Sequence, residues 1–223
     1  MKKNSRAIPK HHFTLKDFPG FSAKDLKDLE SYYAAQLHGH EAPERRVGWK
    51  TAESQRVRFE ALTRVAPLKN SKILDVGCGL GAFWGYLKEH KIPVKYTGVD
   101  LFPGVIAEAK KIYPDAKFEA RPLLRRPFPA RTFDYSFLSG VFNVKVKDNW
   151  KYMEALLNCV LKQTKKAVAV NVLNAESGLK ESDRFMVAPK ELVRFGRSLK
   201  VKKTYLMDHY HHLDLTLFLY KNE

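Results

Sequence analysis

A glycine-rich turn between a strand and a helix is the feature that most constrains how this chain folds. Residues 73–82 read Ile-Leu-Asp-Val-Gly-Cys-Gly-Leu-Gly-Ala, an apolar strand pattern that leads directly into alternating glycines and then a helical pattern. Glycine lets the backbone bend sharply, and it lets a ligand approach the main chain with no Cβ in the way. The run therefore predicts a strand–turn–helix unit of an α/β fold, with a ligand crevice at the carboxyl end of the strand.

Strand and helix patterns alternate through the rest of the chain. Strands are expected at residues 73–76, 94–99, 117–120, 133–138, 166–172, 200–207 and 213–220, and helices at 22–37, 51–65, 82–90, 103–113, 150–161 and 189–199. Alternation with short connections predicts a Rossmann-like, doubly wound, mostly parallel seven-stranded sheet. The last two strands have no helix between them, which predicts a C-terminal antiparallel hairpin.

The chain of 223 residues is long enough for one domain with a substantial core. We expect residues 1–20 to form a basic, partly ordered arm, because they carry Pro9 and Pro19 and lack periodicity. Residues 21–223 are expected to form a single domain, with a helical lid at 21–70 and the Rossmann-like core at 71–223.

Composition excludes several classes of protein. A hydrophobic content of 44% excludes a disordered chain, and no apolar run approaches the length of a membrane span. The basic N-terminus has no apolar segment behind it, so we expect no secretory signal. The two cysteines, Cys78 and Cys159, are too few for a disulfide framework, which favours a cytoplasmic location.

The charge balance is the one unusual feature of the composition. The sequence has 40 Lys and Arg against 24 Asp and Glu, a formal net charge of +16. Such an excess favours a polyanionic partner or an anionic small molecule, and by itself it indicates nothing about the fold.

The glycines alone are ambiguous, because Gly77-x-Gly79-x-x-Ala82 also satisfies the dinucleotide-binding pattern. Asp75 separates the two interpretations: a carboxylate at the strand end would repel a pyrophosphate, but it suits an ammonium group or ordered water beside a cationic ligand. The spacing Asp-x-Gly-x-Gly-x-Gly at residues 75–81 resembles motif I of the class I S-adenosylmethionine (SAM)-dependent methyltransferases. Asp100 ends the next strand, where an acid can accept both ribose hydroxyls.

The resemblance extends over residues 32–221. Within it, the stretches 38–59, 139–145 and 208–221 are similar to patterns found in one bacterial group of these enzymes. It implies SAM as the cofactor and leaves the substrate open. The implied cofactor-binding residues in the core are Asp75, Gly77, Cys78, Gly79, Gly81, Asp100, Leu101, Leu123, Ser139 and Gly140. From the lid, Trp49, Gln55 and Arg58 are candidates, with Arg58 as a partner for the cofactor carboxylate.

One departure concerns the adenine. In such enzymes an Asp often follows the third strand and contacts the adenine amino group, whereas this chain has Arg121-Pro122-Leu123 there. The adenine contact would then fall to the backbone N–H of Leu123 or to a more distant side chain.

Three residues are candidates for catalysis. Asn143, just after the fourth strand, could hydrogen-bond an acceptor, although Asn is also a common turn residue. His209 could act as a general base and Tyr210 could form a substrate wall, although solvated hairpin residues are the competing interpretation. An extended strand would place His209 and His211 on one face. No metal site is expected, because no further ligands stand at suitable spacing.

The sequence therefore favours methyl transfer from SAM to a small-molecule acceptor, with an anionic acceptor preferred because of the net charge. An RNA or protein methyltransferase is the alternative, since residues 121–151 hold seven Lys and Arg against two acids. However, the Asn/Asp-Pro-Pro-aromatic signature of amino-group nucleic-acid methyltransferases is absent after the fourth strand. A non-catalytic SAM-binding partner protein is a further alternative. No membrane insertion is expected.

Overall fold

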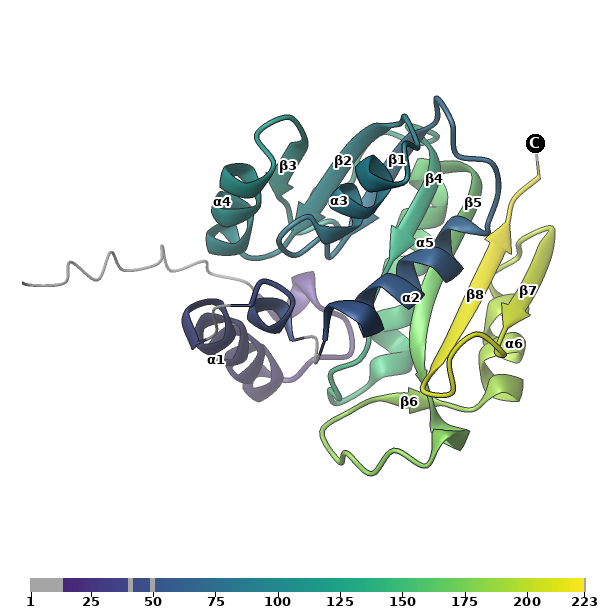
Figure 1. Ribbon diagram of the computed structural model, residues 1–223. Coiled ribbons are helices and arrows are strands. Elements are labelled where there is room, and N and C mark those ends of the chain that lie inside the picture. Colours follow the sequence, from purple (N-terminus) through teal and green to yellow (C-terminus); the bar gives the residue numbers. More distant parts are fainter. Residues whose placement is uncertain (1–13, 40–41, 49–50, 223) are drawn as a thin grey trace, which may run out of the picture.

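The computed structural model describes residues 14–39, 42–48 and 51–222. One sheet dominates it, formed by β1 (Lys72–Val76), β2 (Lys95–Asp100), β3 (Lys117–Ala120), β4 (Phe133–Leu138), β5 (Thr164–Asn174), β6 (Met186–Val187), β7 (Lys203–Met207) and β8 (Asp214–Tyr220). The strand order is β3-β2-β1-β4-β5-β8-β7, as Figure 1 shows. The first five strands are parallel, while β8 runs antiparallel to both of its neighbours, β5 and β7.

The predicted α/β class and C-terminal hairpin are confirmed, and the seven predicted strands form the main path of the sheet. The eighth strand, β6, has two residues and pairs in parallel with the end of β5 at Leu173 and Asn174. A two-residue strand is too short to produce an alternating pattern, so the sequence contained no sign of it.

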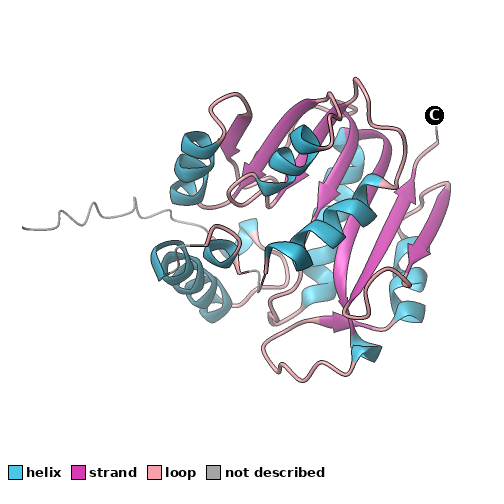
Figure 2. Ribbon diagram, viewed as in Figure 1, coloured by secondary structure: helices cyan, strands magenta, loops and turns pink. Residues whose placement is uncertain are grey.

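The helices are α1 (Ala23–Gly39), α2 (Ala52–Thr63), α3 (Ala82–Glu89), α4 (Pro103–Ile112), α5 (Asn149–Gln163) and α6 (Pro189–Ser198), with short 3-10 turns at η1 (Leu15–Asp17), η2 (Arg45–Val47) and η3 (Ala175–Ser177). Their starts follow local rules. Thr51 caps α2 by accepting a hydrogen bond from the Ser54 backbone N–H at 3.1 Å, and Pro103 occupies the first turn of α4. Figure 2 shows how these helices flank the strands.

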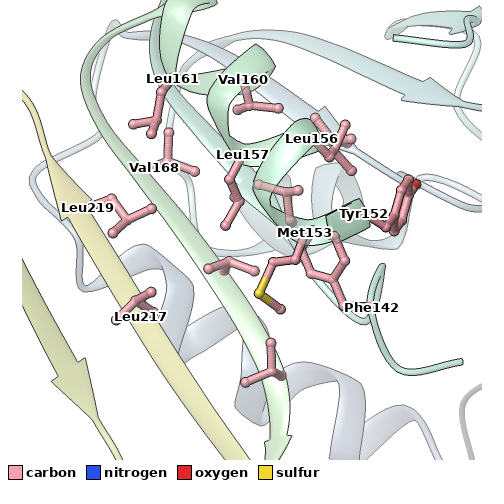
Figure 3. Packing of buried hydrophobic residues seen from close by; sticks show 14 of the residues in the cluster. Phe142, Tyr152, Met153, Leu156, Leu157, Val160, Leu161, Val168, Leu217 and Leu219 are labelled. Atoms are coloured by element: carbon pink, nitrogen blue, oxygen red, sulfur yellow. The ribbon is translucent and has the colours of Figure 1, made fainter. Parts of the chain in front are cut away.

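Two hydrophobic clusters pack on opposite faces of the sheet. Helices α2 and α3 cover the face formed by Ile73, Phe137 and Ala169. Helices α5 and α6 cover the opposite face, where Leu157 and Met153 of α5 pack against Val168 of β5 and Leu217 of β8 (Figure 3). Burial of each such side chain contributes about 1.5–3 kcal/mol, so the two clusters hold the strand ends in a fixed arrangement.

The described part of the N-terminal region packs closely against the rest of the domain. Phe18 is 2% exposed, and its ring lies 5.2 Å from that of Phe21 and 6.3 Å from that of Tyr152 on α5. The described end of the expected arm, residues 14–20, therefore packs against the domain. Helix α2 also belongs to the core, because its Phe59 and Leu62 are buried in the cluster with α3.

No helix within the described ranges is long and apolar enough to cross a membrane.

Candidate functional site

A cavity opens at the carboxyl ends of β1, β2 and β4, and most of the residues expected from the sequence line it. These are Gln55, Asp75, Gly77, Cys78, Gly79, Asp100, Leu101, Leu123, Ser139, Gly140 and Asn143. The cavity lies where parallel strands on either side of β1 run to helices on opposite faces, which is the position expected for ligands in open α/β sheets.

The glycine loop has a backbone that only glycine adopts easily. Gly77, Gly79 and Gly81 have φ angles of +69°, +54° and +83°. A Cβ at Gly79 would lie 3.2 Å from the Val47 side chain, and one at Gly81 would lie 2.6 Å from Phe118. Gly81 itself serves as the residue before α3, so it shapes the turn without lining the cavity.

Asp100 is fixed by the loop that it faces. One carboxylate oxygen accepts a hydrogen bond from the Gly79 backbone N–H at 3.0 Å, and the other accepts one from the Phe102 N–H at 3.2 Å. Burial raises the pKa of Asp100, while these hydrogen bonds oppose the increase. Each oxygen can accept a further hydrogen bond, so the carboxylate is suited to two neighbouring hydroxyl groups of a ligand.

Asp75 is the second buried acid of the cavity, 4% exposed. Its carboxylate accepts a hydrogen bond from the Tyr96 hydroxyl at 2.6 Å. Burial raises the pKa of Asp75 to about 7, with the hydrogen bond from Tyr96 lowering it and the charge of Asp100 raising it. A cationic group placed beside Asp75 would favour the ionised carboxylate.

Leu101 and Leu123 line the cavity from the segments that follow β2 and β3. Arg121 is the first residue after β3. Its Nε and Nη2 donate to Glu119 at 3.0 and 2.8 Å, and its guanidinium lies 4.1 Å from the Phe128 ring centroid. These contacts hold the segment that carries Leu123 against the end of β3.

Ser139 connects the cavity to a buried polar network. Its hydroxyl donates to Asn171 Oδ1 at 3.1 Å, and Asn171 Nδ2 donates to Thr216 Oγ1 at 2.5 Å. The Tyr210 hydroxyl accepts from Thr216 at 2.8 Å, so it is bound within this network. Tyr210 is absent from the cavity lining in the described residues, but Asn171 connects it to Ser139, because Asn171 Nδ2 also donates to the Tyr210 hydroxyl at 3.3 Å.

The expected placement of the histidines on a strand face is wrong. Residues 208–213 form the connection between β7 and β8, where Asp214 N–H donates to the His211 carbonyl at 3.1 Å and closes a turn. The His209 side chain is 70% exposed and lies 3.5 Å from Asp208. The turn removes the two-residue alternation of a strand, and His209 does not line the cavity.

Arg58 has a partner that the sequence did not suggest. Its Nε donates to Asp214 Oδ1 at 2.7 Å and its Nη2 lies 2.5 Å from Oδ2, with both side chains at most 5% exposed. His211 Nδ1 lies 2.9 Å from the same carboxylate. Arg58 therefore joins α2 to the start of β8, while Gln55, one turn earlier, lines the cavity. The third lid candidate, Trp49, lies outside the described residues.

Sequence reasoning missed several cavity residues, among them Phe18 and Arg184. They come from segments that are distant along the chain from the glycine loop, and no local pattern marks them. Within the described ranges, no group of three or more His, Cys, Asp or Glu side chains could hold a metal ion.

Comparison with known proteins shows what this chain is similar to. A family model described as a methyltransferase domain matches residues 73–164. The protein Rv1506c of Mycobacterium tuberculosis, which carries a methyltransferase name, is 28% identical over 158 residues, covering 67% of this chain and 92% of that protein. Trans-aconitate 2-methyltransferase of Escherichia coli is 31% identical over 123 residues, covering 44% of this chain. That match spans about half of the E. coli enzyme (48%).

A solved structure supports the same fold. Magnesium protoporphyrin IX methyltransferase of Synechocystis PCC 6803, with bound S-adenosylhomocysteine (SAH), superposes with a TM-score of 0.63 at 11% identity. The alignment covers 89% of this chain and all of that one (100%). At this identity the likeness concerns the fold.

Proposed function

We propose that this chain, which belongs to the class I SAM-dependent methyltransferases, transfers a methyl group from SAM to a small anionic acceptor. The observation that carries the proposal is a single cavity in which the glycine loop, two buried acids and the loop after β4 meet. The E. coli relative named for trans-aconitate, a small carboxylate, supports an anionic small molecule as acceptor.

The cavity fits the cofactor on several independent points. The positive φ angles let the glycine loop turn sharply beside the cavity, and the side chains of Val47 and Val141 approach Gly79 and Gly77 too closely to admit a Cβ. Asp100 is fixed in position to accept hydrogen bonds from the two ribose hydroxyls, and Asp75 offers a carboxylate for the amino group. Leu101 and Leu123 provide apolar surface for the adenine.

When bound, SAM supplies a methyl group on a cationic sulfur, so the transfer is an in-line displacement that requires little further chemistry from the protein. The chain's task is then to position the two reactants and exclude water. Aromatic side chains of the N-terminal segment, Phe18, Phe21 and Tyr33, line the cavity and limit the access of water. Asn143 presents a side-chain oxygen that can accept a hydrogen bond from the acceptor.

Calorimetric titration with SAM and with SAH tests the cofactor assignment. We expect micromolar binding of both, strong loss of binding in Asp100→Ala, and no change in the matched control Asp115→Ala, whose carboxylate pairs with Lys88 on the exposed surface. No binding of either compound at micromolar concentrations would contradict the proposal.

Methyl-labelled SAM then tests the acceptor class. The purified protein is incubated with a metabolite extract or with total RNA, and the label is followed into each. We expect label in the small-molecule fraction. Label in RNA alone would favour the nucleic-acid alternative, and cofactor binding without transfer to any fraction would favour a non-catalytic binding protein.

A further inference from the structure

Two loops that are far apart in the sequence are joined beside the cavity. The Phe185 backbone N–H donates to the Asn143 carbonyl at 2.9 Å, and the Lys145 N–H donates to the Asp183 carbonyl at 2.9 Å. Arg184 lies between these bonds, in an antiparallel bridge with the loop after β4. The main chain therefore pairs Arg184 with Val144, the residue that follows Asn143, and both Arg184 and Asn143 line the cavity.

Asn143 carries a buried polar atom that the described residues leave unsatisfied. Its side-chain Oδ1 has no hydrogen-bond partner among them, although it is shielded from solvent. Buried polar atoms are almost always hydrogen-bonded, and leaving one unpaired is unfavourable. A ligand O–H or N–H group in the cavity would supply the missing donor.

Arg184 brings a positive charge to the same place. Its Nε donates to Glu181 at 3.2 Å and lies 3.9 Å from a carboxylate oxygen of Asp183. A guanidinium has five N–H donors in a planar fork, so these partners leave donors for a ligand. Arg121, the other cationic side chain in the described cavity lining, directs all three of its nitrogens to Glu119 and to a backbone carbonyl.

We propose that Asn143 and Arg184 form the acceptor subsite, and that the acceptor carries a carboxylate beside the O–H or N–H group that is methylated. The fork of Arg184 binds the carboxylate, and Asn143 Oδ1 accepts the hydrogen bond from the neighbouring O–H or N–H. This assignment rests on the methyl-transfer function proposed above.

The chemistry of the step balances without a further reactant. A lone pair on the acceptor oxygen or nitrogen forms the new bond to the methyl carbon, and the electron pair of the broken C–S bond stays on sulfur. The acceptor loses the proton that was hydrogen-bonded to Asn143, and this proton passes to water. Asn143 positions the acceptor and takes no proton itself, because an amide oxygen is a hydrogen-bond acceptor and a very weak base.

Matched pairs of small probes test the subsite. Salicylate and anthranilate carry an O–H or N–H beside a carboxylate, whereas phenol and aniline lack the carboxylate. Each is titrated calorimetrically into the protein saturated with SAH. We expect the two acids to bind at least tenfold more tightly than their neutral counterparts.

Substitutions then assign the preference to a residue. Arg184→Gln should abolish the difference between acid and neutral probe, while the affinity for SAH and the affinity for phenol stay unchanged. Arg184→Lys, which keeps the charge and loses the fork, should give an intermediate preference. Arg125→Gln, which removes an exposed arginine of the loop after β3, is the matched control and should leave the preference intact.

The outcomes separate the two proposals. Equal binding of salicylate and phenol to the SAH complex, or no binding of either acid, overturns the subsite while leaving the cofactor assignment intact. An unchanged preference in a folded Arg184→Gln variant also overturns it. Failure of the unmodified protein to bind SAH contradicts the proposed function instead.

Discussion

Lowering the pH from 7 to 5 should weaken SAM binding, because protonation of Asp75 removes the negative charge that we propose faces the amino group of the cofactor. Asp75 is buried, and its pKa in the free protein is raised to about 7. The α-amino group of the ligand keeps its proton across this range, since such groups have pKa values of about 7.7–8.0. A change in SAM affinity between pH 7 and pH 5 therefore reflects protonation of a group on the protein.

The size of the effect follows from the pKa. About half of the Asp75 carboxyls are ionised at pH 7, and roughly 1% at pH 5. If the bound ammonium group keeps the carboxylate ionised throughout, the dissociation constant rises about 50-fold between these pH values, or about 2.3 kcal/mol.

The free energy of unfolding of the free protein follows the opposite trend with pH. A raised carboxyl pKa stabilises the fold at low pH, and that stabilisation is lost as the pH rises from 3.8 toward about 7.

Calorimetry at several pH values measures both the affinity and the proton release. At pH 7 about half a proton should be released per SAM bound, visible as a dependence of the heat on the ionisation enthalpy of the buffer. Asp75→Asn should make the affinity nearly independent of pH, which separates Asp75 from Asp100, the other buried acid. Tyr96→Phe removes a hydrogen bond that lowers the pKa of Asp75, so the loss of affinity should begin at higher pH. A constant affinity from pH 7 to pH 5 in the unmodified protein would refute the reasoning.

Three substitutions test the rest of the site and its support. Asp100→Ala removes two charge-assisted hydrogen bonds to the ribose and should weaken SAM binding by about 3 kcal/mol or more, roughly 100-fold, in a calorimetric titration. Gly79→Ala forces an L residue to φ +54° and places a Cβ 3.2 Å from the Val47 side chain. It should reduce the free energy of unfolding by about 1–2 kcal/mol and weaken SAH binding as well. Arg58→Met leaves Asp214 buried without its main partner, and urea denaturation should show a loss of about 3–5 kcal/mol.

Matched controls separate these effects from general damage. Gly178→Ala also introduces a side chain at a positive φ, of +77°, but with no atom within 4 Å of the new Cβ, so SAH binding should be unchanged. Arg56→Met removes an ion pair with Glu89 whose two side chains are 45% and 57% exposed, and it should leave the unfolding midpoint within error. A large loss in Arg56→Met, or none in Arg58→Met, would contradict the assignment of stability to the buried pair.

Local features of the chain were predictable because each depends on residues close together in the sequence. The cap at Thr51, the proline at the start of α4 and the glycines of the loop all act through the backbone within a few residues. Continuous apolar runs marked the buried strands, since a strand covered on both faces leaves few positions for polar side chains. The strand ends then placed Asp75 and Asp100 at the same edge of the sheet.

Contacts between distant segments were not predictable from the sequence, and they determine which of the candidate side chains reach the cavity. The carboxylate that pairs with Arg58 belongs to Asp214, which is 156 residues away in the sequence. His209 lies in the exposed connection between β7 and β8, so its spacing from His211 does not place the two side chains on one strand face. Neither the Arg58–Asp214 ion pair nor the turn at His209 leaves a periodic pattern in the sequence.

The sequence by itself determined the α/β class, the glycine loop and the two acids at the strand ends, because periodicity, glycine and proline act locally. The tertiary structure alone decided that β8 lies between β5 and β7, that α2 belongs to the core, and that Arg184 pairs with Val144 in the loop that carries Asn143. These arrangements arise when sheet and helices bury their apolar faces against one another, which brings together residues that no spacing along the chain connects.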